Sequence, residues 1–358
     1  MWIIQLSWYL GSLAAVIATV LSMLPHKVWW MRIWDFPRIQ ILLLGLVMLA
    51  CGVFVAPDQQ AMRTIWLVTF GLLILSVIQQ IRWAVRMTPL ARVEVPSADD
   101  SGVGTLRVIA SNVDYTNAGR HAAMRSLVSH EPDLLALVEV DQHWASVLEG
   151  ADEAEENGEG ENDRFPHRLS ELISDGRGMA LLSRVPLHDA TIRHLVLDDR
   201  PSIWATIKGS DVEGSLASDD QLIGICVLHP PPPGLEKQDK DERMSSKPRD
   251  IELQVAAQMI ADSPIEHWIM IGDFNDVGWS RTTEHAKATG GLLDPRIGRG
   301  FFNTFPARRP LLRYPIDHVL VTRALRVARL ERLNDIGSDH LPLLADLRVQ
   351  MTEASAEK

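Results

Sequence analysis

Residues 268–276 read WIMIGDFND, and the predicted fold depends on this stretch. Four apolar residues form a run short enough for a buried strand, and Gly272 permits a turn directly after it. Asp273 and Asn275 follow two positions apart, and in extended backbone such residues point the same way. We therefore expect a carboxylate and a carboxamide to converge at the end of a strand, where α/β folds place their ligands. An ordinary turn is the alternative, because Asp, Asn and Gly are common turn residues.

The composition differs between the two parts of the 358-residue chain. Residues 1–103 hold 7 Lys and Arg against 5 Asp and Glu, whereas the remainder holds 28 against 41, a formal charge of −13. An acidic domain of this kind does not attract duplex nucleic acid through a broad basic face. The 2 cysteines show no CxxC or metal-binding spacing, which argues against a disulfide framework or a zinc cluster.

Three runs without a charged side chain predict a membrane anchor in residues 1–86. They cover 24, 19 and 18 residues, each close to the ~20 that span the hydrocarbon core of a bilayer. Tryptophans lie near their ends, as interfacial anchors do. The predicted transmembrane helices cover about 3–24, 39–57 and 64–83. A signal peptide is the alternative for the first run, but that run lacks a basic n-region and two further apolar runs follow it.

The expected location is the cell (inner) membrane, with the lipid bilayer as a partner of a multi-pass protein. The positive charges beside the runs indicate the orientation. Lys27, Arg32 and Arg38 lie between the first two runs, and Arg82, Arg86 and Arg92 follow the third. The loop between the second and third runs holds only Arg63. The positive-inside rule then favours a cytoplasmic domain.

Downstream of the anchor, the chain divides into a linker, one domain and a tail. Residues 87–103 contain 2 prolines and small polar residues without periodicity, which is typical of a linker. Many strand-like runs with few helices fill residues 104–350 and favour two packed β-sheets with helices outside. Residues 150–163 hold 7 acidic and no basic side chains, so we expect a disordered insertion, with a cation-binding loop as the alternative. Residues 351–358 form the tail.

Polar residues recur at the ends of the predicted strands, and together they make a coherent phosphoester site. Carboxylates and carboxamides are hard oxygen ligands that suit Mg²⁺ or Mn²⁺. A histidine held by a carboxylate can contact or protonate a phosphoryl group. Each residue alone has an ordinary explanation, such as a turn, a helix start or a core histidine. The set consists of Asn112, Glu139, His229, Asp273, Asn275, Asp317, Asp339 and His340.

The motifs around these residues resemble the endonuclease/exonuclease/phosphatase superfamily, which includes DNase I-like nucleases, sphingomyelinases and inositol polyphosphate phosphatases. The resemblance covers about residues 104–350. It rests on Asn112 after a strand, Glu139 in LVEVD, His229 in LHPPPP, and the motifs GDFND, PIDHVL and GSDHLPL in the family's order. It implies an α/β fold, a four-layer α/β/β/α sandwich of two packed β-sheets, with a site dependent on Mg²⁺ or Mn²⁺ at one edge of the sheets.

The resemblance implies a metal side of the site. Glu139 resembles the principal metal ligand, with Asn112 beside it, and Asp339 resembles a further metal-site carboxylate. Asp273 resembles the residue that positions or deprotonates the attacking water. Asn275 resembles the partner of Asp273 on the phosphate.

The resemblance also implies a phosphate side. His340 resembles the histidine that binds the scissile phosphate, oriented by Asp317. His229 resembles the second phosphate-side histidine of the nuclease and sphingomyelinase branches. Arg249 and Tyr314 are candidate substrate contacts. The alternatives are a surface salt bridge for Arg249 and a packed aromatic for Tyr314.

Three further stretches resemble a bacterial membrane-anchored branch of the superfamily: WSR after the GDFND turn, TFPARRP before PIDHVL, and HPPPPG. Some members of this branch resemble a teicoplanin-resistance protein thought to act on lipid-linked phosphates outside the membrane. That resemblance implies a domain on the outer face, against the charge bias above. The sequence leaves the side of the membrane open.

The leading hypothesis is a membrane-anchored, metal-dependent phosphoester hydrolase that acts on a lipid-linked or headgroup phosphate near the bilayer surface. A membrane-tethered nuclease is the alternative, because the same chemistry cleaves nucleic acid. It would need a basic groove, for which Arg308, Arg309 and Arg313 are candidates. A non-catalytic membrane sensor or scaffold with a relic site is a third hypothesis. It predicts the loss of a metal or water-activating residue, whereas Glu139 and Asp273 are both present.

Overall fold

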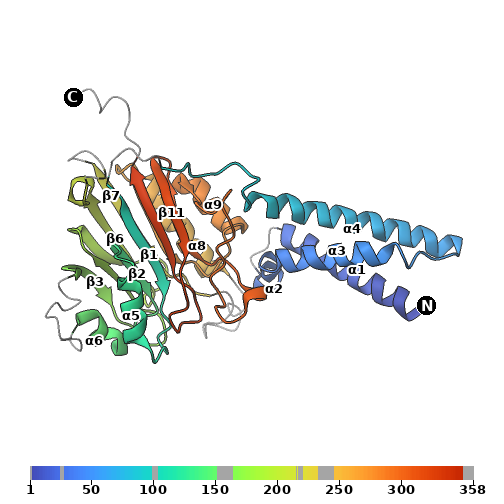
Figure 1. Cartoon of the computed structure of the whole chain (residues 1–358), viewed down its shortest axis with the longest axis horizontal. Coiled ribbons are helices and arrows are strands. Elements are labelled where there is room, and N and C mark those ends of the chain that lie inside the picture. The colour runs from blue at the N-terminus through green and yellow to red at the C-terminus, as the bar shows by residue number, and fades with distance from the viewer. Residues whose placement is uncertain are drawn as a thin grey trace, which may run out of the picture.

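The computed structural model of the chain describes residues 2–24, 28–98, 104–150, 164–214, 216, 221–232 and 246–349. Figure 1 shows two parts, a bundle of long helices and a body of two stacked β-sheets with shorter helices outside. The long helices run side by side away from the body. They are α1 (Trp2–Met23), α3 (Arg38–Gly52) and α4 (Gln60–Arg86).

Each sheet of the body has six strands. The first sheet has the order β11-β12-β1-β2-β4-β3, and the second has the order β5-β6-β7-β8-β10-β9. The strands of the first sheet are β1 (Leu106–Asn112), β2 (Leu134–Val138), β3 (His167–Glu171), β4 (Met179–Ser183), β11 (Leu325–Arg332) and β12 (Leu343–Val349). Those of the second sheet are β5 (His188–His194), β6 (Pro201–Lys208), β7 (Leu222–Leu228), β8 (His267–Asp273), β9 (Leu292–Leu293) and β10 (Asp317–Thr322).

The main core lies between the two sheets. Val108 and Ala110 of β1 and Ile269 and Ile271 of β8 belong to it, two positions apart as the period of a strand requires. The alternate residues of the same strands belong to apolar clusters beneath the outer helices. Because both faces of β8 are covered, its sequence is a continuous apolar run, and residues 268–271 are all buried.

Helices cover the outer face of each sheet (Figure 1). The first sheet carries α5 and α6, and the second carries α8 and α9. The predicted sandwich of two packed sheets with flanking helices is therefore confirmed. The helices of the body are α5 (Arg120–Val128), α6 (Ala145–Glu149), α8 (Lys247–Ala261) and α9 (Arg281–Gly290), and the shorter elements are α2 (Trp29–Arg32), η1 (Ile33–Asp35), η2 (Gln142–Trp144), η3 (Gly209–Asp211) and η4 (Pro310–Leu312).

The topology brings strand ends of both sheets to one edge of the body, where Asn112, Asp273 and Asp317 lie, and we call it the polar edge. β1 runs parallel to β2 and ends at Asn112, and β7 runs parallel to β8, with Leu228 opposite Gly272. β10 is antiparallel to β8 and begins at Asp317, opposite Asp273. Gly272 has a φ of 137°, and a Cβ atom there would overlap the carbonyl oxygen of Leu228. Only glycine therefore lets β7 and β8 approach this closely next to the polar edge.

The helices of the bundle differ in length. α1 with 22 residues and α4 with 27 are long and apolar enough to cross a membrane. α3 has 15 residues, which at 1.5 Å per residue is about 22 Å and less than the ~30 Å of a hydrocarbon core. The predicted span 39–57 is wrong beyond residue 52, because the helix ends at Gly52. Hydropathy reports side chains only, whereas glycine and the approaching Pro57 disfavour helical backbone.

The segment between bundle and body is packed onto the body. Val95 is fully buried in the main core, and the carbonyl of Pro96 accepts a hydrogen bond of 3.1 Å from the backbone N–H of Val327. Residues 99–103 of the predicted linker lie outside the described residues. The same holds for the predicted acidic insertion beyond Gly150 and for the predicted tail.

Candidate active site

Five of the predicted site residues stand at the polar edge because of their positions on the strands. Asn112 is the last residue of β1, and Asp273 is the last residue of β8. Glu139 directly follows β2, His229 directly follows β7, and His340 precedes β12. Glu139 has a φ of 64°, a left-handed conformation that is uncommon outside glycine and re-aims a side chain at a strand end. Both sheets therefore contribute to one site.

The amide of Asn112 joins two carboxylates at the centre of the site. Its Nδ2 donates hydrogen bonds of 2.8 Å to Glu139 Oε1 and 3.1 Å to Asp273 Oδ2. Its Oδ1 accepts a hydrogen bond of 3.1 Å from the backbone N–H of Asp114. The NH₂ group therefore faces the carboxylates and holds them side by side. The role of Asn112 as a metal ligand remains a prediction.

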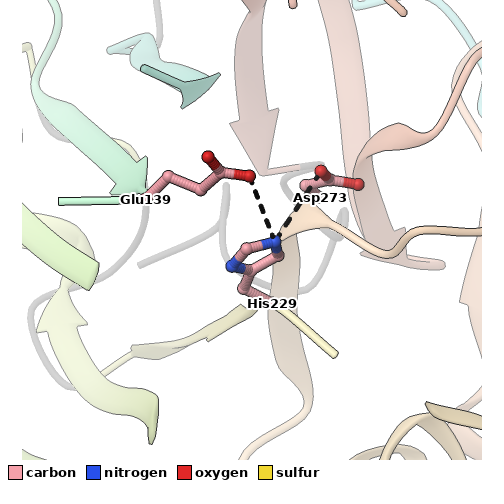
Figure 2. A group of neighbouring side chains, drawn as sticks. All are labelled: Glu139, His229 and Asp273. Carbon is pink, nitrogen blue, oxygen red and sulfur yellow. Dashed lines mark ion pairs between the residues drawn. The ribbon is translucent and has the colours of Figure 1, made fainter. Parts of the chain in front are cut away.

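Among the residues that the structure describes, two groups of side chains have ligand atoms close enough to hold a metal ion. In each group these atoms lie within 4.8 Å of one another, and Asp273 belongs to both. Figure 2 shows the first group, in which the ring of His229 points between the carboxylates, with Nε2 3.9 Å from Glu139 Oε1 and from Asp273 Oδ2. This distance is too long for a hydrogen bond. The second group consists of Asp273, Asp317 and His340.

In the described part of the chain, the cationic side chain near Asp273 is His340, whose Nε2 lies 3.6 Å from Asp273 Oδ2. Among the described residues, neither Glu139 nor Asp273 forms an ion pair with lysine or arginine, and Asp273 is only 1 % exposed. Buried charges are normally paired or bind a metal. Carboxylate oxygens with one imidazole also suit a hard divalent cation. The residues present therefore fit such an ion.

Burial shifts the protonation of both carboxylates. It raises the pKa of Asp273 to about 7, although His340 and the hydrogen bonds to the carboxylate oppose the rise. Burial also raises the pKa of Glu139, opposed by the hydrogen bond from Asn112. A nearby cation would favour the ionised forms again.

His340 is held in a defined orientation. Its Nδ1 lies 2.8 Å from Asp317 Oδ2, and its Nε2 lies 3.6 Å from Asp273 Oδ2. Burial alone would lower the pKa of His340, but the charges of Asp317 and Asp273 outweigh burial and raise it to about 10. The imidazolium form therefore predominates at neutral pH, with Nδ1–H donated to Asp317 and Nε2–H directed into the site.

The second histidine has the opposite character. Burial lowers the pKa of His229 well below the ordinary value, and the positive charges of Arg200 and His340 add to this. A neutral imidazole can accept a hydrogen bond or bind a metal. The site thus contains one charged and one neutral histidine, which sequence motifs alone do not distinguish.

Asn275 lies in the turn that follows β8, and Arg249, in the first turn of α8, contacts the backbone of that turn. The backbone N–H of Asn275 donates a hydrogen bond of 2.8 Å to Asp273 Oδ1, and its Nδ2 donates one of 3.0 Å to the carbonyl of Pro230. Arg249 is 2 % exposed and donates a hydrogen bond of 2.7 Å to the carbonyl of Asn275. Arg249 forms ion pairs of 3.1 Å with Asp250 and 3.4 Å with Asp276, but its guanidinium is buried rather than at the surface. Its contact with substrate remains a prediction. Arg249 supports the turn from behind.

Asp339 and Tyr314 line an open cavity of about 910 Å³ next to the site. Asp339 is exposed, and its carboxylate is absent from both groups that could hold a metal. Its charge nevertheless raises the pKa of Glu139. Tyr314 packs edge-on against Phe36, with the ring centroids 5.5 Å apart. It is therefore a packed aromatic that also faces the cavity, and its contact with substrate remains a prediction.

Sequence reasoning missed three residues that hold the site in place. Ser338 donates a hydrogen bond of 2.8 Å to the carbonyl of Asn112 and accepts one of 3.0 Å from the backbone N–H of His340. Asp276, in the stretch quoted first, accepts a hydrogen bond of 2.8 Å from Arg32 Nη2. Arg32 lies at the base of the helical bundle. In the sequence, its positive charge indicates only membrane orientation, and no pattern predicts that it contacts Asp276.

Comparison with known proteins supports a family assignment. The sequence profile described as "Endonuclease/Exonuclease/phosphatase family" matches residues 109–340, which include every predicted site residue. No curated protein sequence matches the chain.

Solved structures share the fold of the body. The human nocturnin catalytic domain with bound sulfate is 17% identical, with a TM-score of 0.50 over 69% of this chain and 95% of that chain. An endonuclease/exonuclease/phosphatase from Bacteroides vulgatus is 16% identical, with a TM-score of 0.52 over 69% and 99%. D. rerio TDP2 complexed with a single-strand DNA product is 15% identical, with a TM-score of 0.50 over 68% and 99%. The profile spans well over half of the chain, and the chain therefore belongs to the endonuclease/exonuclease/phosphatase family, whose members hydrolyse phosphoester bonds.

Proposed function

We propose that this protein is a membrane-anchored phosphoester hydrolase that depends on Mg²⁺ or Mn²⁺. The observation that carries the proposal is the convergence of Glu139 and Asp273 at one polar edge, without a lysine or arginine partner among the described residues. These two carboxylates, with Asn112 and His229 beside them, would hold the cation. When bound, the cation would neutralise charge that develops on the phosphoryl oxygens.

The side chains themselves supply the proton chemistry. Asp273 would position a water and accept its proton, because a nearby cation favours the ionised form of its carboxylate. His340, charged and fixed by Asp317, directs Nε2–H at the site and can bind a phosphoryl oxygen. Asn275 lies two residues after Asp273. Its NH₂ group donates one hydrogen to the carbonyl of Pro230 and would donate the other to the phosphate.

The helical bundle supports a membrane location. Large apolar side chains are exposed along all three helices, among them Leu13 and Leu43 at 53% and 57% exposure and Leu75 at 63%. Such a surface requires a lipid environment. We propose that α1 and α4 span the cell membrane, with α3 packed against both of them, and that the bilayer presents a lipid-linked or headgroup phosphate to the site. The resemblance to a bacterial membrane-anchored branch supports the same proposal.

A nuclease is the second candidate, because Arg308 and Arg309 line the cavity beside the site. TDP2, a structural neighbour, was solved with a single-strand DNA product. Arg313 does not serve this purpose in the same way, because its guanidinium is engaged by the carbonyl of Ala307.

The test compares substrates on the detergent-purified full chain. With Mg²⁺ present, we expect phosphate release from a polyprenyl diphosphate and no cleavage of single- or double-stranded DNA. His340→Ala should abolish the release. Cleavage of DNA that is lost in His340→Ala would replace the lipid substrate by nucleic acid. Full activity in His340→Ala would refute the site.

A further inference from the structure

The cavity beside the site is larger than a single phosphate group requires. Its volume of about 910 Å³ lies within the range of pockets that enclose a whole ligand. One wall is the segment from Asp114 to Gly119, which comes after β1 in the chain. The opposite wall is the loop from Phe305 to Tyr314. The ring centroids of Phe305 and His340 are 4.7 Å apart, so this wall extends to the candidate active site. The substrate therefore has room for a substantial group beyond the scissile phosphate.

Two cations stand on the loop wall. Arg308 and Arg309 are both exposed and line the cavity. Within the described residues, neither guanidinium takes part in a hydrogen bond or an ion pair. Paired arginines without a protein partner are suited to a second anionic group, because each guanidinium can form charge-assisted hydrogen bonds to phosphate oxygens.

The same loop meets the base of the helical bundle. Gln40, in the first turn of α3, donates a hydrogen bond of 2.7 Å to the carbonyl of Leu311, and the ring of Phe36 packs against that of Tyr314. Leu311 is 88% exposed and Leu312 is 44% exposed. Exposed leucines beside arginines, at the level where apolar helices begin, are typical of a segment at the surface of a bilayer.

We propose that this cavity binds the non-scissile part of a membrane-resident amphiphile that carries a second anionic group, such as a lipid diphosphate. In a lipid diphosphate the bond that breaks is the phosphoanhydride: water adds to the terminal phosphorus, which would lie between Asp273 and His340, and the lipid monophosphate leaves. The phosphate of this leaving group is the second anionic group, which would contact Arg308 and Arg309. The hydrocarbon chain would leave past Leu311 and Leu312 towards the bilayer. This inference rests on the proposed function and names the substrate class of the same site.

The experiment separates the two parts of this substrate. The full chain in detergent micelles receives isoprenyl monophosphates and diphosphates of increasing chain length, together with the water-soluble p-nitrophenyl phosphate. We expect KM to fall with chain length and to be lower for each diphosphate than for its monophosphate. Arg308→Gln with Arg309→Gln should raise KM for diphosphates about 10-fold or more and remove their preference. Leu311→Ser with Leu312→Ser should weaken the dependence on chain length.

Arg323→Ala is the matched control, because Arg323 is also exposed but directly follows β10 at the far end of the strand that begins at Asp317. It should leave every KM unchanged. Hydrolysis of p-nitrophenyl phosphate without any preference for chain length or a second phosphate would overturn the inference, whereas the metal-dependent hydrolase of the proposed function would stand.

Binding distinguishes the remaining outcomes. Titration of the lipid diphosphate into wild type and the Arg308/Arg309 double variant in EDTA measures affinity without turnover. If no ester is hydrolysed, the proposed function fails, yet binding that weakens about 10-fold in the double variant still supports the cavity. Equal binding by both proteins, or tighter binding of a single-stranded oligonucleotide that depends on the same arginines, would overturn the lipid assignment.

Discussion

Asp273 and Asp294 are the same side chain, and each is only 1 % exposed, yet their electrostatic surroundings are opposite. Arg296 donates hydrogen bonds of 2.9 Å and 2.8 Å to the carboxylate of Asp294. Burial would raise the pKa of Asp294, but Arg296 outweighs it and holds the pKa well below the ordinary value. Asp273 faces Glu139 and the Asn112 amide instead, and its pKa rises to about 7.

This difference shows that burial alone does not identify a site. Asp294 obtains its counter-ion from the next residue but one, so the pair is complete within a single turn and stabilises the fold. Asp273 has no lysine or arginine partner in the described part of the chain, and its cationic neighbour is His340, which shares its charge between Asp273 and Asp317. A buried carboxylate that is not fully compensated by the protein is suited to a metal-dependent site.

The largest effect should come from removing the uncompensated charges. Asp273→Asn and Glu139→Gln should each lower kcat by at least about 10³-fold, roughly 4 kcal/mol of transition-state stabilisation. The thermal midpoint in EDTA should stay the same or rise, because an unfavourable buried charge is gone. Turnover and thermal unfolding of the same preparations check this. Near wild-type turnover in either variant would remove that residue from the site.

Asp294→Asn should act on stability rather than on chemistry. It leaves the buried Arg296 without its anion, which typically costs about 3–5 kcal/mol. Thermal unfolding in detergent measures the loss. Asp199→Asn is the control, because Asp199 pairs with Arg177 while 42% exposed, and an exposed pair contributes about 1 kcal/mol or less. Equal losses in the two variants would contradict the comparison.

The two aspartates should also respond to pH in opposite directions. Without metal, the pKa of Asp273 is about 7 in the folded protein against an ordinary value of 3.8. Between these values the folded state holds a proton that the unfolded chain has released, so stability falls as pH rises, by up to about 4 kcal/mol. The lowered pKa of Asp294 instead provides stability above its ordinary value of 3.8, which is lost in acid.

Thermal midpoints of wild type and Asp273→Asn in EDTA, from acid to neutral pH, test this prediction. The difference between the two proteins should grow in favour of Asp273→Asn as pH rises. The fall of the thermal midpoint in acid should be the same in both proteins, because Asp294 is intact in each. A difference that is independent of pH would mean that Asp273 titrates normally.

Metal addition should give the smallest effect. At about 100 times its dissociation constant, Mg²⁺ or Mn²⁺ should stabilise the wild type by about 2.7 kcal/mol. Asp273→Asn and Glu139→Gln should lose this shift, whereas Asp294→Asn should keep it despite its lower starting midpoint. Differential scanning fluorimetry with and without EDTA measures all four proteins. A shift that survives in Glu139→Gln would place the ion elsewhere.

Much of the site follows from local sequence because short patterns control it. The apolar run before Asp273 predicts a buried strand, and β8 ends at that residue. Asn112 and Glu139 stand after similar runs, so their positions at strand ends were predictable. The second apolar run is helical only as far as Gly52, because hydropathy does not report backbone conformation. The charge of Arg249 was visible in the sequence, but its burial was not.

The sequence by itself determined the two-sheet body, the apolar helices and the residue types at the polar edge, because strand periodicity and hydropathy act over a few neighbouring residues. The family followed from the resemblance of short motifs, which the family profile confirms. Tertiary structure alone decided which charges are compensated. Arg32 reaches Asp276 across 244 positions, and Asn112 reaches Asp273 across 161. The energy of a charge depends on its distance in space to other charges and on its burial, and neither quantity is encoded in sequence separation.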